Sequence, residues 1–125
     1  MSFAFANPFR AAAPAADKIS AADAVKLVSE GAMTLIDVRD HAEVAQTGKA
    51  KGAVHIPLFQ LQQKADPRHP EFHPELSTDQ TIGVYCASGA RSEMARRALA
   101  GFGYGNVHNI GGLFHWQSAG GACDS

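Results

Sequence analysis

The sequence has little of what marks several large classes of protein. Its 125 residues include only two cysteines, too few for a disulfide framework, which favours a reducing compartment that we take to be the cytoplasm. Eleven basic residues against twelve acidic ones leave a formal charge of -1, which gives no basis for binding nucleic acid or an anionic membrane. No apolar run approaches the roughly 18 residues of a membrane-spanning helix. We therefore expect small molecules or proteins as partners, with no nucleic acid and no membrane.

Hydrophobic residues make up 46% of the chain, which is enough for the core of one ordinary globular domain. We expect this domain over residues 18–120. The segment before it, MSFAFANPFRAAAPAAD, has neither the basic start nor the unbroken apolar stretch of a signal peptide. We therefore expect a flexible N-terminal arm over residues 1–17 and a flexible, Gly-rich tail over residues 121–125.

Strand-like and helix-like segments alternate along the expected domain. Short apolar runs predict strands at 33–38, 53–57, 81–85 and 107–110. Helical spacing of apolar residues predicts helices or helical turns at 20–30, 40–45, 58–64, 92–102 and 113–120. The proline-containing segment 65–77 is predicted to be loop. This alternation predicts an α/β domain with a small, mainly parallel sheet and helices on both of its faces.

Three residues of chemical interest fall where predicted strands end. Asp37 and Arg39 leave the strand 33–38, and Cys86 directly follows the strand 81–85. In α/β sheets, ligands bind outside the carboxyl ends of the strands. We therefore expect these three residues to share one edge of the sheet.

A short loop joins Cys86 to the helix predicted from Ser92. The loop consists of small residues and one arginine: Ala87, Ser88, Gly89, Ala90 and Arg91. Free backbone N–H groups at the start of the helix should converge there and form an anion-binding nest. A sulfur in that nest should have a lowered pKa and exist as a thiolate, the nucleophilic form. The alternative is a buried structural cysteine, since free cysteine is among the most buried residue types, and the residues alone leave both interpretations open.

Four blocks of the sequence, in the order LIDVRD, GAVHIP, CASGARS and NIGGLFHW, resemble a single-domain rhodanese, a thiosulfate sulfurtransferase-like domain. The resemblance covers roughly residues 18–120 and implies the rhodanese-like α/β fold. It also implies sulfur transfer in two steps. Cys86 takes the outer sulfur of thiosulfate or of a persulfide donor as a cysteine persulfide, and then passes it to a thiophilic acceptor, which is cyanide in vitro and a thiol or a protein in the cell. It implies no cofactor and no metal.

The resemblance also assigns roles to residues. Cys86 is expected to be catalytic, and the loop residues with Ser92 are expected to bind the anion or persulfide. Asp37 and Arg39 are expected to support the site. Arg91 has two possible roles: it lends positive charge to the bound anion, or it pairs with Asp37 or another nearby acid and braces the loop.

Two other functions compete with sulfur transfer. Related phosphatases and arsenate reductases also place a cysteine and an arginine around an anion, but with five residues between them, whereas four separate Cys86 from Arg91 here. A shorter loop makes a smaller cradle, which suits a single sulfur better than a phosphate. The other alternative is a non-catalytic persulfide-binding or regulatory interaction module. Cys123 is either a resolving thiol for an oxidised Cys86 or an exposed tail cysteine.

Overall fold

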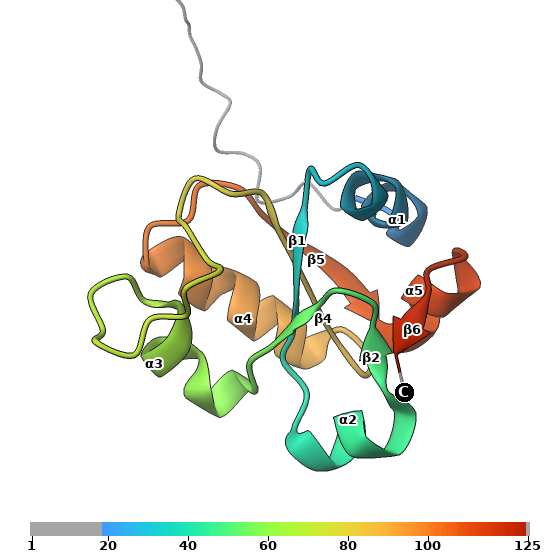
Figure 1. Ribbon diagram of the computed structural model, residues 1–125, viewed down its shortest axis with the longest axis horizontal. Coiled ribbons are helices and arrows are strands. Elements are labelled where there is room, and N and C mark those ends of the chain that lie inside the picture. The colour runs from blue at the N-terminus through green and yellow to red at the C-terminus, as the bar shows by residue number, and fades with distance from the viewer. Residues whose placement is uncertain (1–18, 125) are drawn as a thin grey trace, which may run out of the picture.

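A four-stranded parallel sheet forms the centre of the computed structural model, which describes residues 19–124 (Figure 1). Its strands are β1 (Thr34–Asp37), β3 (Val54–His55), β4 (Ile82–Cys86) and β5 (Val107–Gly112). They lie in the order β3-β1-β4-β5, and each neighbouring pair is parallel. The four predicted strands are thus confirmed with small shifts in their bounds. The predicted arm over residues 1–17 lies outside the described residues.

Helices cover both faces of the sheet, as predicted (Figure 1). The helices α1 (Ala21–Ser29) and α5 (Leu113–Ser118) lie on one face. The other face carries the turn η3 (Leu58–Gln60) and the helices α3 (Leu61–Ala65) and α4 (Ala90–Gly101). The helix α2 (His41–Thr47) follows β1 at its carboxyl end. Within the described part of the chain, no helix is long and apolar enough to cross a membrane.

The two faces have separate hydrophobic clusters because successive side chains of a strand point in opposite directions. Along β4, Val84 and Cys86 join the cluster beneath α3 and α4, which also holds Leu99. Tyr85, between them in sequence, joins the cluster beneath α1 and α5. The period of the strand therefore points the sulfur of Cys86 toward α4.

The helix α4 begins at Ala90, earlier than the start at Ser92 that the sequence predicts. Its first turn therefore includes Arg91 and Ser92. Its apolar residues share one face, because Ala95 and Leu99 are buried in the cluster and Phe102 packs against it. The early start shortens the connection between β4 and α4 and brings the N-terminus of α4 close to Cys86.

The C-terminal segment differs from the flexible tail that the sequence predicts. Residues Cys123–Asp124 form β6, which pairs antiparallel with β2 (Lys49–Ala50). The indole N–H of Trp116 and the backbone N–H of Lys51 both donate to the carbonyl of Ala122, at 2.8 and 2.9 Å. These bonds hold the segment against β2. A pair of two-residue strands has no hydrophobic period that the sequence alone would reveal.

Candidate active site

The connection between β4 and α4 bends sharply directly after Cys86. Cys86 is the last residue of β4, and α4 begins at Ala90. Gly89 makes the bend with a φ of 110°, in a region that favours glycine. Its backbone N–H donates to Cys86 Sγ at 3.0 Å. The bend thus directs a backbone donor at the sulfur, as the nest predicted from the sequence requires.

The sulfur of Cys86 is buried but surrounded by donors. Its residue is 1% exposed, and the hydroxyl of Ser92 lies 3.5 Å from Sγ. Burial raises the pKa of this thiol, whereas hydrogen bonds from the Ser92 side chain and from the backbone N–H groups of Ser92, Gly89 and Ser88 lower it. The lowering contributions prevail, and the pKa lies below the ordinary value of a cysteine. The site therefore favours the thiolate.

Asn109, on β5, links the loop to the neighbouring strand. Its Oδ1 accepts from the backbone N–H of Gly111 at 3.0 Å and lies 2.7 Å from Ser92 Oγ. Its Nδ2 donates to the carbonyl of Gly89 at 3.1 Å. Asn109 was not predicted from the sequence as part of the site. The available signal was an amide side chain within a predicted strand, since a polar side chain that packing partly buries requires a partner.

The other loop residues lie at the surface. Ala87, Ser88 and Ala90 are exposed, and Gly89 is half-buried. Ser92 is fully buried in the first turn of α4. The structure thus brings together the predicted loop and Ser92 around the sulfur, with the small side chains facing outward and the backbone facing inward.

Arg91 pairs with Glu43 of α2. Its two terminal nitrogens donate to the two carboxylate oxygens at 2.7 and 2.8 Å, and Asp40 Oδ1 lies 3.6 Å from Nη1. The hydrogen bonds from Arg91 lower the pKa of Glu43 to about 2. The sequence allowed Asp37 or another nearby acid as the partner of Arg91. The partner is Glu43 and not Asp37. The pair ties the end of the loop to α2, which favours the bracing role.

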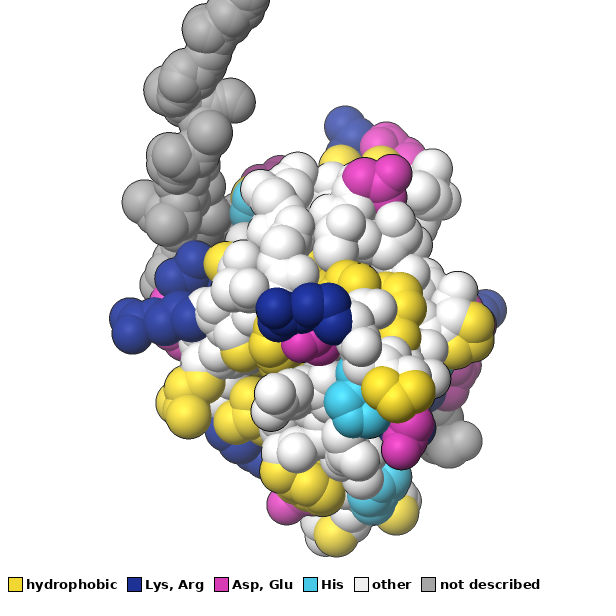
Figure 2. All heavy atoms as spheres, turned by 90° about the vertical axis from the view of Figure 1, so that its left-hand side faces the viewer, with side chains coloured by type: hydrophobic (Ala, Val, Ile, Leu, Met, Phe, Trp, Pro, Cys, Tyr) yellow, Lys and Arg dark blue, Asp and Glu magenta, His cyan; other side chains and the backbone are white. Residues whose placement is uncertain are grey.

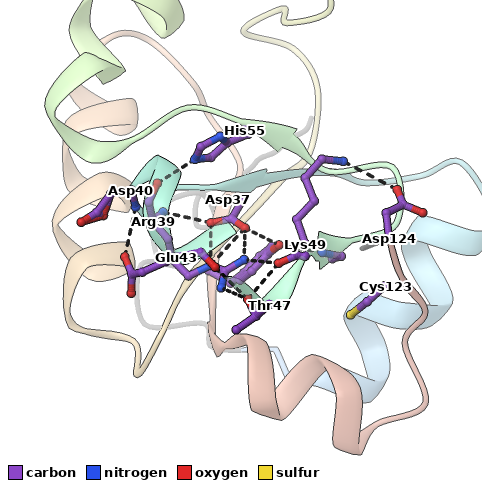
Figure 3. Close-up of polar contacts among 12 residues, drawn as sticks. Asp37, Arg39, Asp40, Glu43, Thr47, Lys49, His55, Cys123 and Asp124 are labelled. Carbon is purple, nitrogen blue, oxygen red and sulfur yellow. Dashed lines mark hydrogen bonds and ion pairs between the residues drawn. The ribbon is translucent and has the colours of Figure 1, made fainter. Parts of the chain in front are cut away.

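Asp37 and Arg39 form a buried ion pair at the carboxyl end of β1 (Figure 3). Arg39 Nη2 donates to Asp37 Oδ2 at 2.7 Å and to the carbonyl of Gly48 at 2.7 Å. Its Nη1 donates to Thr47 Oγ1 at 2.8 Å. The hydroxyl of Tyr85 donates to Asp37 Oδ2 at 2.7 Å. The pair therefore supports Tyr85, the strand residue next to Cys86, and its hydrogen bonds go to Tyr85, Thr47 and Gly48 and not to the sulfur. Tyr85 was not predicted as part of this support.

The carboxyl end of β5 packs tightly against the loop. Gly112 has an extended backbone with φ of -114°. A Cβ atom at this position would collide with the carbonyl oxygen of Ala87. The backbone N–H of Gly112 donates to His115 Nδ1 at 3.0 Å. Glycine is thus required here by the close approach of two backbones.

Two pockets flank the loop. The β5 pocket has a volume of about 370 Å³, and its lining includes Ser88, Gly89, Asn109 and His115. The η3 pocket has a volume of about 280 Å³ and is lined by Val38, Asp40, Pro57, Leu58, Phe59 and Arg91. The β5 pocket therefore offers polar groups, whereas the η3 pocket is mostly apolar. Over residues 19–124 there is no group of three or more His, Cys, Asp or Glu side chains arranged to hold a metal.

Cys123 lies apart from the loop. It is exposed on β6, and β2 and β6 lie beside α5 (Figures 1 and 3). Cys86 is buried beneath α4 on the other face of the sheet. This placement supports the interpretation of Cys123 as an exposed cysteine and gives no support to a resolving role.

The lowered pKa predicts how Cys86 reacts with iodoacetamide. In a Cys123→Ser background, the alkylation rate should reach half of its maximum at a pH below about 8.5, the ordinary midpoint of a cysteine. Ser92→Ala should move that midpoint upward, because it removes a hydrogen bond that stabilises the thiolate. The measurement is the alkylation rate as a function of pH, followed by mass spectrometry.

Ser88→Ala is the matched control, since it leaves the backbone N–H of the loop in place and should keep the wild-type midpoint. A wild-type midpoint at or above that of an ordinary cysteine would contradict an activated thiol.

Comparisons with known proteins agree with the geometry. The Rhodanese-like domain family model matches residues 20–119. A sulfurtransferase of Allochromatium vinosum is 36% identical over 87 residues, which cover 69% of this chain and 73% of the relative. The thiosulfate sulfurtransferase PspE of Escherichia coli is 35% identical over 78 residues, covering 62% of this chain and 68% of the relative.

Solved structures agree in fold. A Rhodopseudomonas palustris protein of unknown function, described as a possible tyrosine phosphatase, superposes with a TM-score of 0.77 at 32% identity, covering 86% of this chain and 84% of that one. The human single-domain sulfurtransferase TSTD1 superposes with a TM-score of 0.72 at 24% identity, covering 86% of this chain and 99% of that one. The match over nearly all described residues and the identity to named sulfurtransferases lead to one conclusion: the chain belongs to the rhodanese-like domain family.

Proposed function

We propose that this protein is a sulfurtransferase that carries a sulfane sulfur on Cys86. The observation that carries the proposal is the sulfur itself, which sits at the start of α4 with the N–H of Gly89 3.0 Å away and with a lowered pKa. The thiolate attacks the outer sulfur of a donor such as thiosulfate. The bond between the two donor sulfurs breaks, sulfite leaves with the bonding electron pair, and Cys86 holds an anionic persulfide.

In the second step, an acceptor attacks the outer sulfur of the persulfide. With cyanide, thiocyanate forms and the Cys86 thiolate is regenerated. A thiol or a protein is the proposed acceptor in the cell. Both steps move negative charge within the loop, where fixed N–H groups of Ser88 and Gly89 and the N-terminus of α4 stabilise it without rearrangement. Ala87 and Ala90 complete the loop, and neither a metal nor a cofactor takes part.

Phosphatase chemistry is the second candidate, since one structural relative is described as a possible tyrosine phosphatase. Two features of this chain favour sulfur transfer over it. Only four residues separate Cys86 from Arg91. In addition, both terminal nitrogens of Arg91 are engaged with Glu43, which leaves fewer donors for a tetrahedral phosphate. A non-catalytic persulfide-binding module is the other alternative, and the activated thiol argues for catalysis instead.

Incubation of the reduced protein with excess thiosulfate is expected to increase its mass by one sulfur atom. Cys86→Ala should abolish the increase, because the acceptor of the sulfur is lost. Cys123→Ser, the matched control at the other cysteine, should retain it. Intact-protein mass spectrometry measures the change, and addition of cyanide should reverse it with release of thiocyanate.

An unmodified wild-type mass with thiosulfate and with a persulfide donor would favour the interaction module. Hydrolysis of an aryl phosphate that depends on Cys86 would favour the phosphatase.

We place the protein in a reducing compartment such as the cytoplasm, because both of its cysteines are free and its chemistry needs a reduced thiol.

A further inference from the structure

The η3 pocket adjoins the loop at Arg91, and two of its lining residues share a hydrophobic cluster with Cys86. Val38 belongs to the same hydrophobic cluster as Cys86, and Leu58 packs against that cluster. The backbone N–H of Leu58 donates to the carbonyl of Val38 at 3.0 Å, which fixes η3 beside the end of β1. A molecule that reaches the loop from this side therefore meets an apolar wall.

Phe59 stands at the surface of this pocket. Its side chain is 73% exposed, although it is one of the largest apolar side chains of the chain. Figure 2 shows the face that carries α3, where hydrophobic side chains lie exposed next to a basic side chain. An exposed aromatic ring at the mouth of an apolar pocket offers a stacking surface to a ring of a ligand.

The charges around the pocket disfavour a ligand with two negative charges. Arg91 is paired with Glu43 at 2.7 Å and has Asp40 at 3.6 Å, so one cation faces two carboxylates. The four residues between Cys86 and Arg91 carry no cation. The thiolate adds a further negative charge. A dianion such as thiosulfate is thus repelled and must also lose its hydration, whereas a monoanion is penalised less.

We infer that the η3 pocket selects organic sulfane-sulfur donors that carry one negative charge and an apolar, ring-sized body, in preference to inorganic thiosulfate. This inference rests on the proposed function and names its substrate class. With benzenethiosulfonate as the probe, the Cys86 thiolate attacks the outer sulfur. The bond from that sulfur to the sulfonyl sulfur breaks, and benzenesulfinate leaves with the electron pair. Cys86 is left as the persulfide, and cyanide then removes the outer sulfur as thiocyanate.

The experiment measures kcat/KM for thiocyanate formation with three donors: benzenethiosulfonate, methanethiosulfonate and thiosulfate. Phe59→Ala is expected to lower kcat/KM about fivefold for benzenethiosulfonate, because it removes the aromatic contact. The values for methanethiosulfonate and thiosulfate should stay within about twofold of wild type. Ratios of variant to wild type for each donor cancel the different intrinsic reactivities of the donors.

Phe114→Ala is the matched control. Phe114 is 71% exposed, almost the same as Phe59, but lies on α5 and outside the η3 pocket. It should leave all three values unchanged. Phe59→Lys tests the charge argument, since a new cation at the pocket should raise kcat/KM for thiosulfate about threefold at low ionic strength while lowering it for benzenethiosulfonate.

The outcomes separate the two proposals. Equal effects of Phe59→Ala on all donors, or no effect on any, would overturn the inference about the pocket and leave the sulfurtransferase proposal standing. Loss of the benzenethiosulfonate signal in Phe114→Ala would overturn it as well, because the selectivity would then lie elsewhere. Absence of thiocyanate from the wild-type protein with all three donors would instead overturn the proposed function, and with it the substrate class.

Discussion

Asp37→Asn is expected to lower the free energy of unfolding by about 3–5 kcal/mol, the usual cost of breaking a buried ion pair by removing one partner. Both residues of the pair are almost inaccessible, with side-chain exposures of 3% for Arg39 and 0% for Asp37. The substitution leaves the guanidinium of Arg39 buried without a counter-charge. An amide at this position would also direct N–H groups at donors, because Arg39 and the hydroxyl of Tyr85 both donate to Asp37.

The effect should extend to β2 and β4. Tyr85 accepts from the backbone N–H of Ala50 at 2.8 Å while it donates to Asp37. Asp37 is thus the final acceptor in a series of two hydrogen bonds that joins β2, β4 and β1. Tyr85→Phe removes the hydroxyl from this series and leaves the buried N–H of Ala50 unpaired. It should therefore lower the free energy of unfolding by less, about 1–3 kcal/mol.

The chain contains its own control for this prediction. Asp66 and Arg68 repeat the spacing of Asp37 and Arg39, with the same fork of hydrogen bonds at 3.0 and 2.9 Å. The carboxylate of Asp66 is only 8% exposed, as in the first pair, but the side chain of Arg68 is 78% exposed. Asp66→Asn therefore leaves its partner in water and should change the unfolding midpoint little. Urea unfolding measures both variants. Equal shifts of the unfolding midpoint for Asp37→Asn and Asp66→Asn would contradict the argument that the burial of Arg39 makes its pair costly to break.

The sequence was informative where local chemistry decides the structure. The bend after Cys86 follows from small residues and a glycine between an apolar strand and a helix, and the structure places Gly89 there with a positive φ. The side of the sheet on which Cys86 lies follows from the strand period. For these reasons the fold class and the loop around the thiol were predictable, and the fold class is confirmed.

Contacts between distant segments were not predictable in the same way. Three acids, Asp37, Asp40 and Glu43, lie within a few residues of one another, and the sequence does not tell which one Arg91 meets. Asp37 is excluded because Arg39, two residues away, already occupies its carboxylate. Such a choice depends on the packing of α2 against the loop, which no local pattern encodes.

The same limit explains the missed residues. Asn109 and Tyr85 act through partners far away in the sequence, 17 residues to Ser92 and 48 residues to Asp37. Their polar atoms meet these partners only once the strands are assembled in the order of the sheet. A buried polar side chain in a strand indicates that a partner exists but does not identify it.

Gly112→Ala is expected to reduce the rate of sulfur transfer to cyanide about a hundredfold, because a displacement of the reacting group by about 1 Å can cost that much. The backbone of Gly112 is extended, with φ of -114° and ψ of 171°, so alanine fits its conformation. The added Cβ nevertheless collides with the carbonyl oxygen of Ala87, next to Cys86. Relief of this contact requires the loop to move away from β5, which shifts the donors around the sulfur.

Gly101→Ala provides the comparison, since a Cβ atom at the end of α4 meets no atom within 4 Å. This variant should retain wild-type activity, because helical alanine is tolerated better than glycine. The displaced loop of Gly112→Ala should also raise the pH midpoint of Cys86 alkylation, a change that mere loss of stability does not produce in a folded sample. Wild-type activity and an unchanged midpoint in Gly112→Ala would show that β5 does not position the loop. The close approach of the two backbones would then have no part in keeping the thiolate ready for reaction.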